Sequence, residues 1–196
     1  MSDPSERTRR LAMLGQEHMR ALASYCAALR TPGLEVPDLD PLDGGTGARM
    51  LLLLEKPGPK TSPARGGTGF VSFDNPDPTA RASHRFCEEA GIERSARAVW
   101  NVCPWWNGTT QFKGPLGQKG LAELPRFLKL LPDLTVAICV GRRAEAARPL
   151  LEGCGLLVFA SAHPSGQVRA SHRDRWEAIP EAWAEGWRAM SQSRQT

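Results

Sequence analysis

Three polar residues of different chemical type stand at the ends of apolar runs in this sequence: Glu55, Asn101 and His163. A carboxylate such as Glu55 can stabilise a developing cation or orient a water molecule. The side chain of Asn101 carries a donor and an acceptor together, so it can read an amide-like edge. His163 can donate a hydrogen bond to a carbonyl oxygen that gains negative charge. Together these abilities match the cleavage of a nucleobase N-glycosidic bond, in which the sugar becomes cationic and the departing base, read in a pocket after flipping, becomes anionic.

The three residues can act together only if the fold brings them to one place, and the apolar runs indicate how. The runs cover residues 49–54, 98–102, 134–140 and 156–160. Because they lack polar alternation, we expect strands that are covered on both faces, as in a parallel sheet. Helical segments alternate with them, which favours a three-layer α/β/α fold with a four-stranded parallel central sheet. Glu55, Asn101 and His163 would then meet at the edge where open α/β sheets bind ligands.

Helical signals fill the remaining segments. Apolar positions at helical spacing predict one N-terminal helix over residues 1–30, followed by a connector rich in Pro, Gly and Asp over residues 31–48. Asp77 before Pro78 is typical of a helix start, and Gly91 is typical of its end. Further helices are expected over residues 121–131, from Gly141, and around Trp176, Trp183 and Trp187, with long loops over residues 56–75 and 107–120.

The bulk properties limit the class of protein. A chain of 196 residues fits one domain over residues 1–196. The apolar runs are too short to span a membrane and there is no secretory signal region, so we expect a cytoplasmic protein without membrane contacts. Five cysteines without a CxxC pair argue against disulfides and against a zinc site, and we expect no metal and no cofactor. The formal net charge of +4 permits nucleic-acid binding without requiring it.

The motifs themselves carry a family resemblance. The segment EKPG at residues 55–58, the strand-end Asn101 and the segment HPS at residues 163–165 resemble the three motifs of the uracil-DNA glycosylase superfamily. The segment FVSFDNPDPTA at residues 70–80 is similar to a bacterial branch of it. The resemblance extends from about residue 49 to the C-terminal helix. Iron–sulfur branches carry four spaced cysteines, a pattern that this sequence lacks, so the resemblance implies a branch without a cluster.

The resemblance implies roles at the base. Glu55 would stabilise the oxocarbenium ion or position the attacking water, and His163 would hold the anionic O2 of uracil. Asn101 would hydrogen-bond to the polar edge of the base. Phe70 matches the aromatic residue that stacks on the flipped base, and Phe73 is a close competitor for that role.

It also implies contacts with DNA. Ser165 and the backbone around Gly58 would contact phosphates, with Gly58 also in the base pocket, and Lys56 could contact a phosphate as well. The loop that follows Ser165 corresponds to the segment that enters the minor groove. Val168 would be its apolar wedge and Arg169 a phosphate or base partner.

The expected activity is hydrolysis of the N-glycosidic bond of uracil in single- or double-stranded DNA of the bacterial nucleoid, by a monomer without an obligate protein partner. Two departures from the family pattern leave alternatives open. Some branches exclude thymine with a tyrosine where this chain has Gly58, so another deaminated base such as hypoxanthine or xanthine could fit. Lys56 replaces a small or neutral residue and could also lower the pKa of Glu55 or attack the sugar as an amine. A protein that binds uracil-containing or abasic DNA without turnover therefore stays possible.

Overall fold

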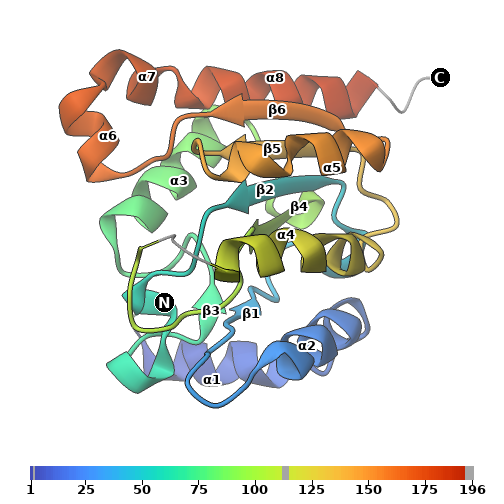
Figure 1. The fold of residues 1–196 in the computed structure, drawn as a ribbon, viewed down its shortest axis with the longest axis vertical. Coiled ribbons are helices and arrows are strands. Elements are labelled where there is room, and N and C mark those ends of the chain that lie inside the picture. The colour runs from blue at the N-terminus through green and yellow to red at the C-terminus, as the bar shows by residue number, and fades with distance from the viewer. Residues whose placement is uncertain (2, 112–114, 193–196) are drawn as a thin grey trace.

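Four parallel strands form the centre of the molecule (Figure 1). The computed structural model describes residues 1, 3–111 and 115–192, so residues 2, 112–114 and 193–196 of the expected domain lie outside the described part. Across the sheet the order is β4 (Arg97–Asn101), β2 (Met50–Leu54), β5 (Val136–Val140) and β6 (Leu157–Ser161). Each strand begins and ends within two residues of an apolar run, and the four-stranded parallel sheet predicted from the sequence is confirmed.

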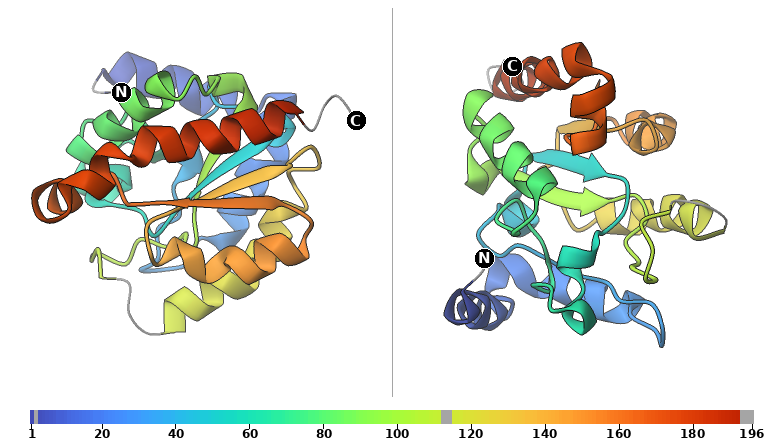
Figure 2. Two further views of the ribbon diagram at one scale, coloured as in Figure 1. Left: turned by 90° about the horizontal axis from the view of Figure 1, so that it is seen from above. Right: turned by 90° about the vertical axis from the view of Figure 1, so that its left-hand side faces the viewer.

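Helices cover both faces of this sheet, as Figure 2 shows from above. One face carries α3 (Pro78–Glu89) and α8 (Ile179–Gln192), and the other carries α4 (Pro115–Leu128) and α5 (Arg148–Gly153). The three-layer α/β/α fold is therefore confirmed. Among the helices that the structure describes, none is both long and apolar enough to cross a membrane.

Burial differs between β6 and the other three strands of the sheet. Every residue of β2, β4 and β5 is buried, as expected for strands that are covered on both faces. The expectation fails for the edge strand β6, where Leu157 is 49% exposed, although β4 at the other edge of the sheet is fully buried. Trp183 of α8 still anchors the helix to β6: its ring is fully buried and its Nε1–H donates to Ser161 Oγ at 2.8 Å.

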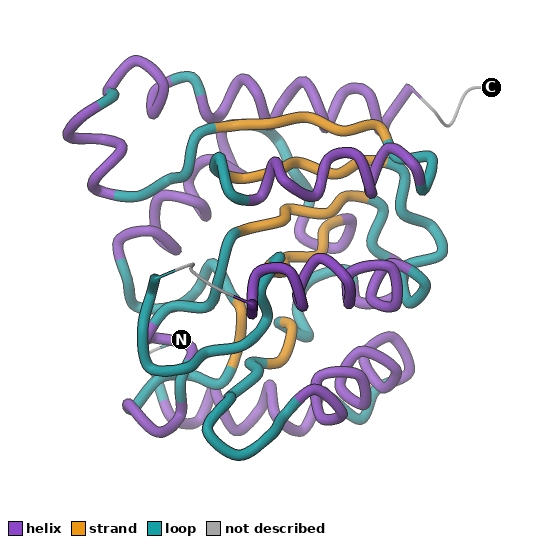
Figure 3. The backbone as a smooth tube through the Cα atoms, in the orientation of Figure 1, coloured by secondary structure: helices purple, strands orange, loops and turns teal. Residues whose placement is uncertain are grey.

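The single N-terminal helix predicted over residues 1–30 is wrong. The segment forms two helices, α1 (Pro4–Met13) and α2 (Glu17–Leu29), as Figure 3 shows. The chain leaves the helical conformation at Gln16, which is extended and precedes α2. Helical spacing of apolar residues continues across this break, so periodicity alone does not reveal it.

The connector predicted over residues 31–48 contains a strand that the sequence did not reveal. Here β1 (Asp38–Leu39) pairs in parallel with β3 (Phe70–Val71) and forms a second, two-stranded sheet. Runs of two residues are too short for a periodic signal.

The remaining helices agree in part with expectation. Asp77 caps α3, and Gly91 follows it with φ +69°, both as predicted. In contrast, α4 begins at Pro115, earlier than predicted, and the part of the expected loop at residues 112–114 lies outside the described residues. Gly141 begins a turn rather than a helix. Two short helices, α6 (Gly166–Ser171) and α7 (Arg173–Glu177), precede α8. Short 3₁₀ helices lie in the connecting segments of the described chain: η1 (Gly45–Gly47), η2 (Pro59–Thr61), η3 (Pro63–Arg65), η4 (Arg94–Ala96) and η5 (Ala144–Ala147).

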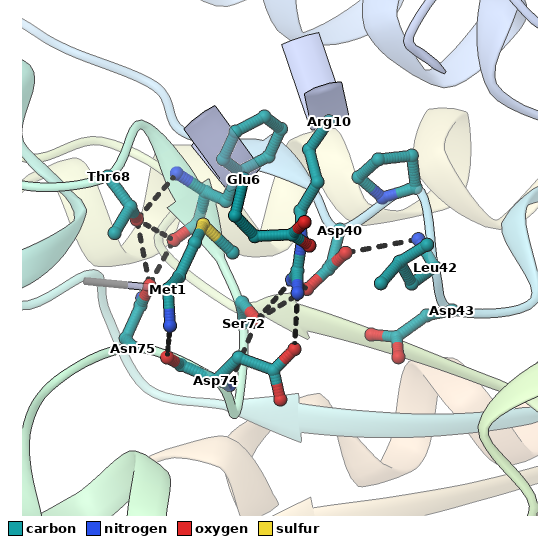
Figure 4. A network of polar contacts seen from close by, with 12 residues as sticks. Met1, Glu6, Arg10, Asp40, Leu42, Asp43, Thr68, Ser72, Asp74 and Asn75 are labelled. Carbon is teal, nitrogen blue, oxygen red and sulfur yellow. Dashed lines mark hydrogen bonds and ion pairs between the residues drawn. The ribbon is translucent and has the colours of Figure 1, made fainter. Parts of the chain in front are cut away.

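A network of buried charges attaches α1 to the segment that follows β3 (Figure 4). The guanidinium of Arg10 donates to the carboxylate of Asp40, and to Asp74 Oδ2 at 2.6 Å. Arg94 approaches the same two carboxylates, at 2.8 and 2.9 Å. The Ser72 hydroxyl also donates to Asp40. These contacts hold the residues after β3 against α1.

Removing Arg10 should therefore cost more than removing its neighbour Arg9. The side chain of Arg10 is 5% exposed and that of Asp40 is fully buried, whereas the side chain of Arg9 is 52% exposed, although both arginines contact Glu6. For Arg10→Ala we expect a loss of about 3 kcal/mol in the free energy of unfolding, because a buried carboxylate loses one of its partners while Arg94 remains. Arg9→Ala should change it little, because an exposed ion pair is weak in water. Urea unfolding of both variants checks this, and equal losses would contradict it.

Candidate functional site

A pocket opens where the carboxyl ends of β2 and β4 meet. Its volume is about 320 Å³, and Glu55, Asn101 and His163 all lie in its wall. The structure thus brings the three polar residues into one cavity. The segment after β3 and the first turn of α3 supply the opposite wall.

Backbone pairing between β2 and β4 positions the first two residues. Asn101 ends β4 opposite Leu54 and is 3% exposed. The ladder continues beyond the strands: the Val102 N–H donates to the Leu54 carbonyl oxygen at 2.9 Å. The Cys103 N–H donates to the Glu55 carbonyl oxygen at 3.0 Å. Glu55 is therefore held through its backbone although it lies outside β2.

Gly141 makes room for Glu55 and His163 to meet. Because β5 lies between β2 and β6, the turn after β5 stands between these two side chains. A Cβ atom at Gly141 would lie 3.1 Å from Glu55 Oε1 and 3.1 Å from the Cβ of His163. Its φ of +95° is also a conformation that favours glycine. The sequence showed this residue only as an expected helix start, and no local signal reveals its place in the site.

Burial favours the neutral form of the His163 imidazole. Burial lowers its pKa below the ordinary value of 6.5, and the carboxylates of Glu55 and Asp77 oppose only part of that effect. A neutral imidazole still carries one N–H donor, so it can hydrogen-bond to an oxygen that becomes negative.

The pocket distinguishes between the two candidate aromatic residues. Phe73 lines it, whereas Phe70 is fully buried in β3 and does not line it. Of the two aromatic residues predicted to stack on a base, the structure therefore places Phe73 and not Phe70 in the pocket wall. Gly58 lines the pocket, and no atom lies within 4 Å of a Cβ placed there, so the pocket is open at this point.

Sequence reasoning missed several polar residues of the pocket wall. Asp77 was identified only as the cap of α3, and it does accept a hydrogen bond from the Ala80 N–H at 3.0 Å. It also lines the pocket, together with Asn75 and Ser83. One signal for Asp77 was available in the sequence. The start of a helix that follows a strand lies near the edge of the sheet where ligands bind, so the residue that caps such a helix is a candidate for the pocket wall.

Lys56 also lines the pocket, but its ammonium group bonds to protein oxygens of residues 107–111. Burial lowers the pKa of Lys56 from its ordinary value.

A basic groove continues from the pocket, and the two hollows share Glu55, Thr110 and His163. The groove has a volume of about 660 Å³. Three arginines that sequence reasoning did not single out lie in its wall: Arg142, Arg143 and Arg175. The guanidinium of Arg143 lies 3.5 Å from Glu55 Oε2.

Of the residues that were predicted to contact DNA in and after the third motif, two line the groove and one does not. Ser165 and Val168 line the groove, and the Ser165 hydroxyl accepts from the Val168 N–H at 3.3 Å. The loop expected after Ser165 is instead the helix α6. Arg169 is exposed and does not line the groove. Its guanidinium lies 5.0 Å from the ring centroid of Trp176.

Among the described residues, no group of three or more His, Cys, Asp or Glu side chains has the arrangement of a metal site.

Comparisons with known proteins support the fold. No family model matches the chain, and no curated protein matches it in sequence. Its structure is similar to the solution NMR structure of a protein from Methanosarcina acetivorans that is assigned provisionally as a uracil DNA glycosylase, with a TM-score of 0.51. The match has 16% sequence identity and covers 74% of this chain and 92% of the other. At this identity the similarity establishes the three-layer fold alone.

Gly141→Ala should strain the backbone and also displace the side chains of Glu55 and His163, which a Cβ atom at this position would contact. Gly91 is a matched control, because its φ is +69° and no atom lies within 4 Å of its Cβ position. We expect Gly91→Ala to cost about 1 kcal/mol in the free energy of unfolding, and Gly141→Ala to cost more. Only Gly141→Ala should shift the imidazole NMR signals of His163. Unchanged signals in that variant would contradict the proposed close approach.

An NMR titration tests the balance of charges at His163. The pKa should lie below 6.5 in the unmodified protein, and Glu55→Gln should lower it further, because the carboxylate that favours the imidazolium is lost. Glu177→Gln, a change in exposed α7, should leave it unaltered. A rise of the His163 pKa in Glu55→Gln would contradict the assignment.

Proposed function

We propose that this protein hydrolyses the N-glycosidic bond of uracil in DNA and leaves an abasic site. The observation that carries the proposal is the meeting of Glu55, Asn101 and His163 in one pocket that opens onto a basic groove. The fold shared with the Methanosarcina protein is consistent with it, because that protein is assigned provisionally to the same activity.

The two hollows suit a nucleotide that has left the base stack. Arg142, Arg143 and Arg175 give the groove the positive charge that phosphates prefer. The pocket next to it would receive the flipped base, which a duplex would otherwise hide. One chain supplies both parts, so the proposal requires DNA and a monomer only.

The residues of the pocket divide the chemistry between the base and the sugar. Asn101 would read the polar edge of uracil, and Phe73 offers its ring as an apolar wall. The bond between C1′ and the base nitrogen breaks, and its electron pair leaves with the base. His163 would donate a hydrogen bond to the anionic O2. Glu55 would stabilise the cationic sugar and orient the water that adds to C1′. The proton that this water loses passes to the anionic base, which leaves as neutral uracil.

A second candidate is release of hypoxanthine or xanthine by the same mechanism. Two observations favour it: the pocket is open at Gly58, and Asp77 adds a second carboxylate to the wall. A purine needs the additional space, and a carboxylate accepts from additional N–H groups. A panel of duplexes with one uracil, hypoxanthine or xanthine decides between the bases.

An oligonucleotide with a single deoxyuridine tests the main proposal. After incubation with the protein and alkali it should be cut at that position. His163→Ala should lower kcat by about 10²–10³-fold, because a donor to the anionic oxygen is lost. Glu55→Gln should lower it by about 10²-fold or more. Both variants should still bind the DNA in fluorescence anisotropy.

His84→Ala is the matched histidine control, since His84 is partly exposed on α3 and does not line the pocket or the groove. Its kcat should stay unchanged. DNA bound without release of any base, in single strands and in U:A and U:G duplexes, would instead favour a protein that binds without turnover.

A further inference from the structure

The ammonium group of Lys56 lies among three oxygen atoms of one neighbouring segment. It donates to the side-chain oxygen of Asn107 at 2.5 Å and to the Thr109 carbonyl oxygen at 2.7 Å. A longer contact of 3.4 Å reaches the Gln111 carbonyl oxygen. Its three N–H donors thus match three acceptors on residues 107–111. The lysine follows Glu55 directly, so these bonds connect the end of β2 to the chain that comes after β4.

The segment at residues 107–111 has few other attachments. All five residues are exposed. Between described residues, its one further hydrogen bond is internal, from the Gln111 N–H to Thr109 Oγ1 at 3.1 Å. The preceding residue is firmly held, because buried Trp106 exchanges two backbone hydrogen bonds with Glu35, at 2.7 and 3.0 Å. Lys56 therefore contacts the segment directly after Trp106, the last residue before it that backbone hydrogen bonds hold.

This segment forms the boundary between the two hollows of the site. Thr110 lines both the pocket and the groove, and Gln111 lines the groove. Its position relative to Glu55 and His163, which also line both hollows, determines how far the pocket is closed on the groove side.

We propose that Lys56 is a positioning residue that holds residues 107–111 as the wall between the base pocket and the groove. This inference rests on the proposed function in one respect: the ligand that the wall encloses is taken to be a flipped base. It differs from two other roles for this lysine, a contact with DNA phosphate and attack on the sugar. Either would require the ammonium group to leave its three acceptors, and attack would also require it to lose a proton and expose its lone pair.

The holding contact can be tested in the protein alone. We expect the backbone order parameters of residues 108–111 to fall from about 0.85 to below about 0.6 in Lys56→Met. Asn107→Ala should lower them in the same direction, and Lys56→Arg, which keeps charge and donors, should restore them in part. Lys129→Met, a change at an exposed lysine just after α4, is the matched control. Unaltered order parameters in Lys56→Met would overturn the proposal, whatever the activity of the protein.

Binding measurements separate a wall from a phosphate contact. A displaced wall should weaken inhibition by free uracil and raise KM by about tenfold in Lys56→Met. Affinity for a uracil-free duplex should stay the same. A lysine that contacts phosphate would instead weaken binding to every DNA and reduce its salt dependence by about one charge. That second result would overturn the proposal.

A trapping experiment addresses the covalent role. Borohydride should leave no protein–DNA adduct in the unmodified protein, and Lys56→Arg should keep most of the base release. An adduct that disappears in Lys56→Arg would overturn the proposal. If the unmodified protein releases no base, the proposed function fails, while the order parameters still decide the role of Lys56.

Discussion

Hydrogen bonding between parallel strands is the constraint on which the site depends. The ladder of β2 and β4 continues past both strands, through Val102 and Cys103, and so holds the backbone of Glu55 beside Asn101. The parallel pairing of β5 with β6 brings His163 to the same edge from the other side. A slip of one residue in either register would turn these side chains to the opposite face, because successive side chains of a strand alternate. Rigid strands thus support a site whose residues lie just beyond them.

Burial then favours the neutral form of His163 in the pocket. Glu55 and Asp77 both favour the imidazolium form of His163, but loss of water around the ring outweighs them and lowers its pKa. Gly141 permits the close approach of these groups, because a side chain there would meet both Glu55 and His163. A neutral donor next to a carboxylate suits a reaction that creates an anion on the base and a cation on the sugar.

Charged side chains hold the loops that form the walls of the pocket. Segments without a strand partner obtain few backbone bonds, so other groups must order them. Arg10 and Arg94 bind the carboxylates of Asp40 and Asp74 behind the segment after β3, and that segment carries Phe73 into the pocket. Lys56 hydrogen-bonds to residues 107–111 in a similar way. The first contacts are buried and the second are exposed, so the wall on the groove side has the weaker support.

The sequence by itself determined the central sheet and the three polar residues at its edge. Apolar runs record burial on both faces, and Asp77 and Gly91 mark the ends of α3 by local chemistry that needs no tertiary contact. The break at Gln16 and the two-residue strands β1 and β3 leave no periodic signal. Only the tertiary structure decided that Phe73 rather than Phe70 faces the pocket, and that Gly141 and three groove arginines belong to the site. Those positions depend on how segments that are far apart in the sequence pack together. The residue types along the chain do not specify that packing.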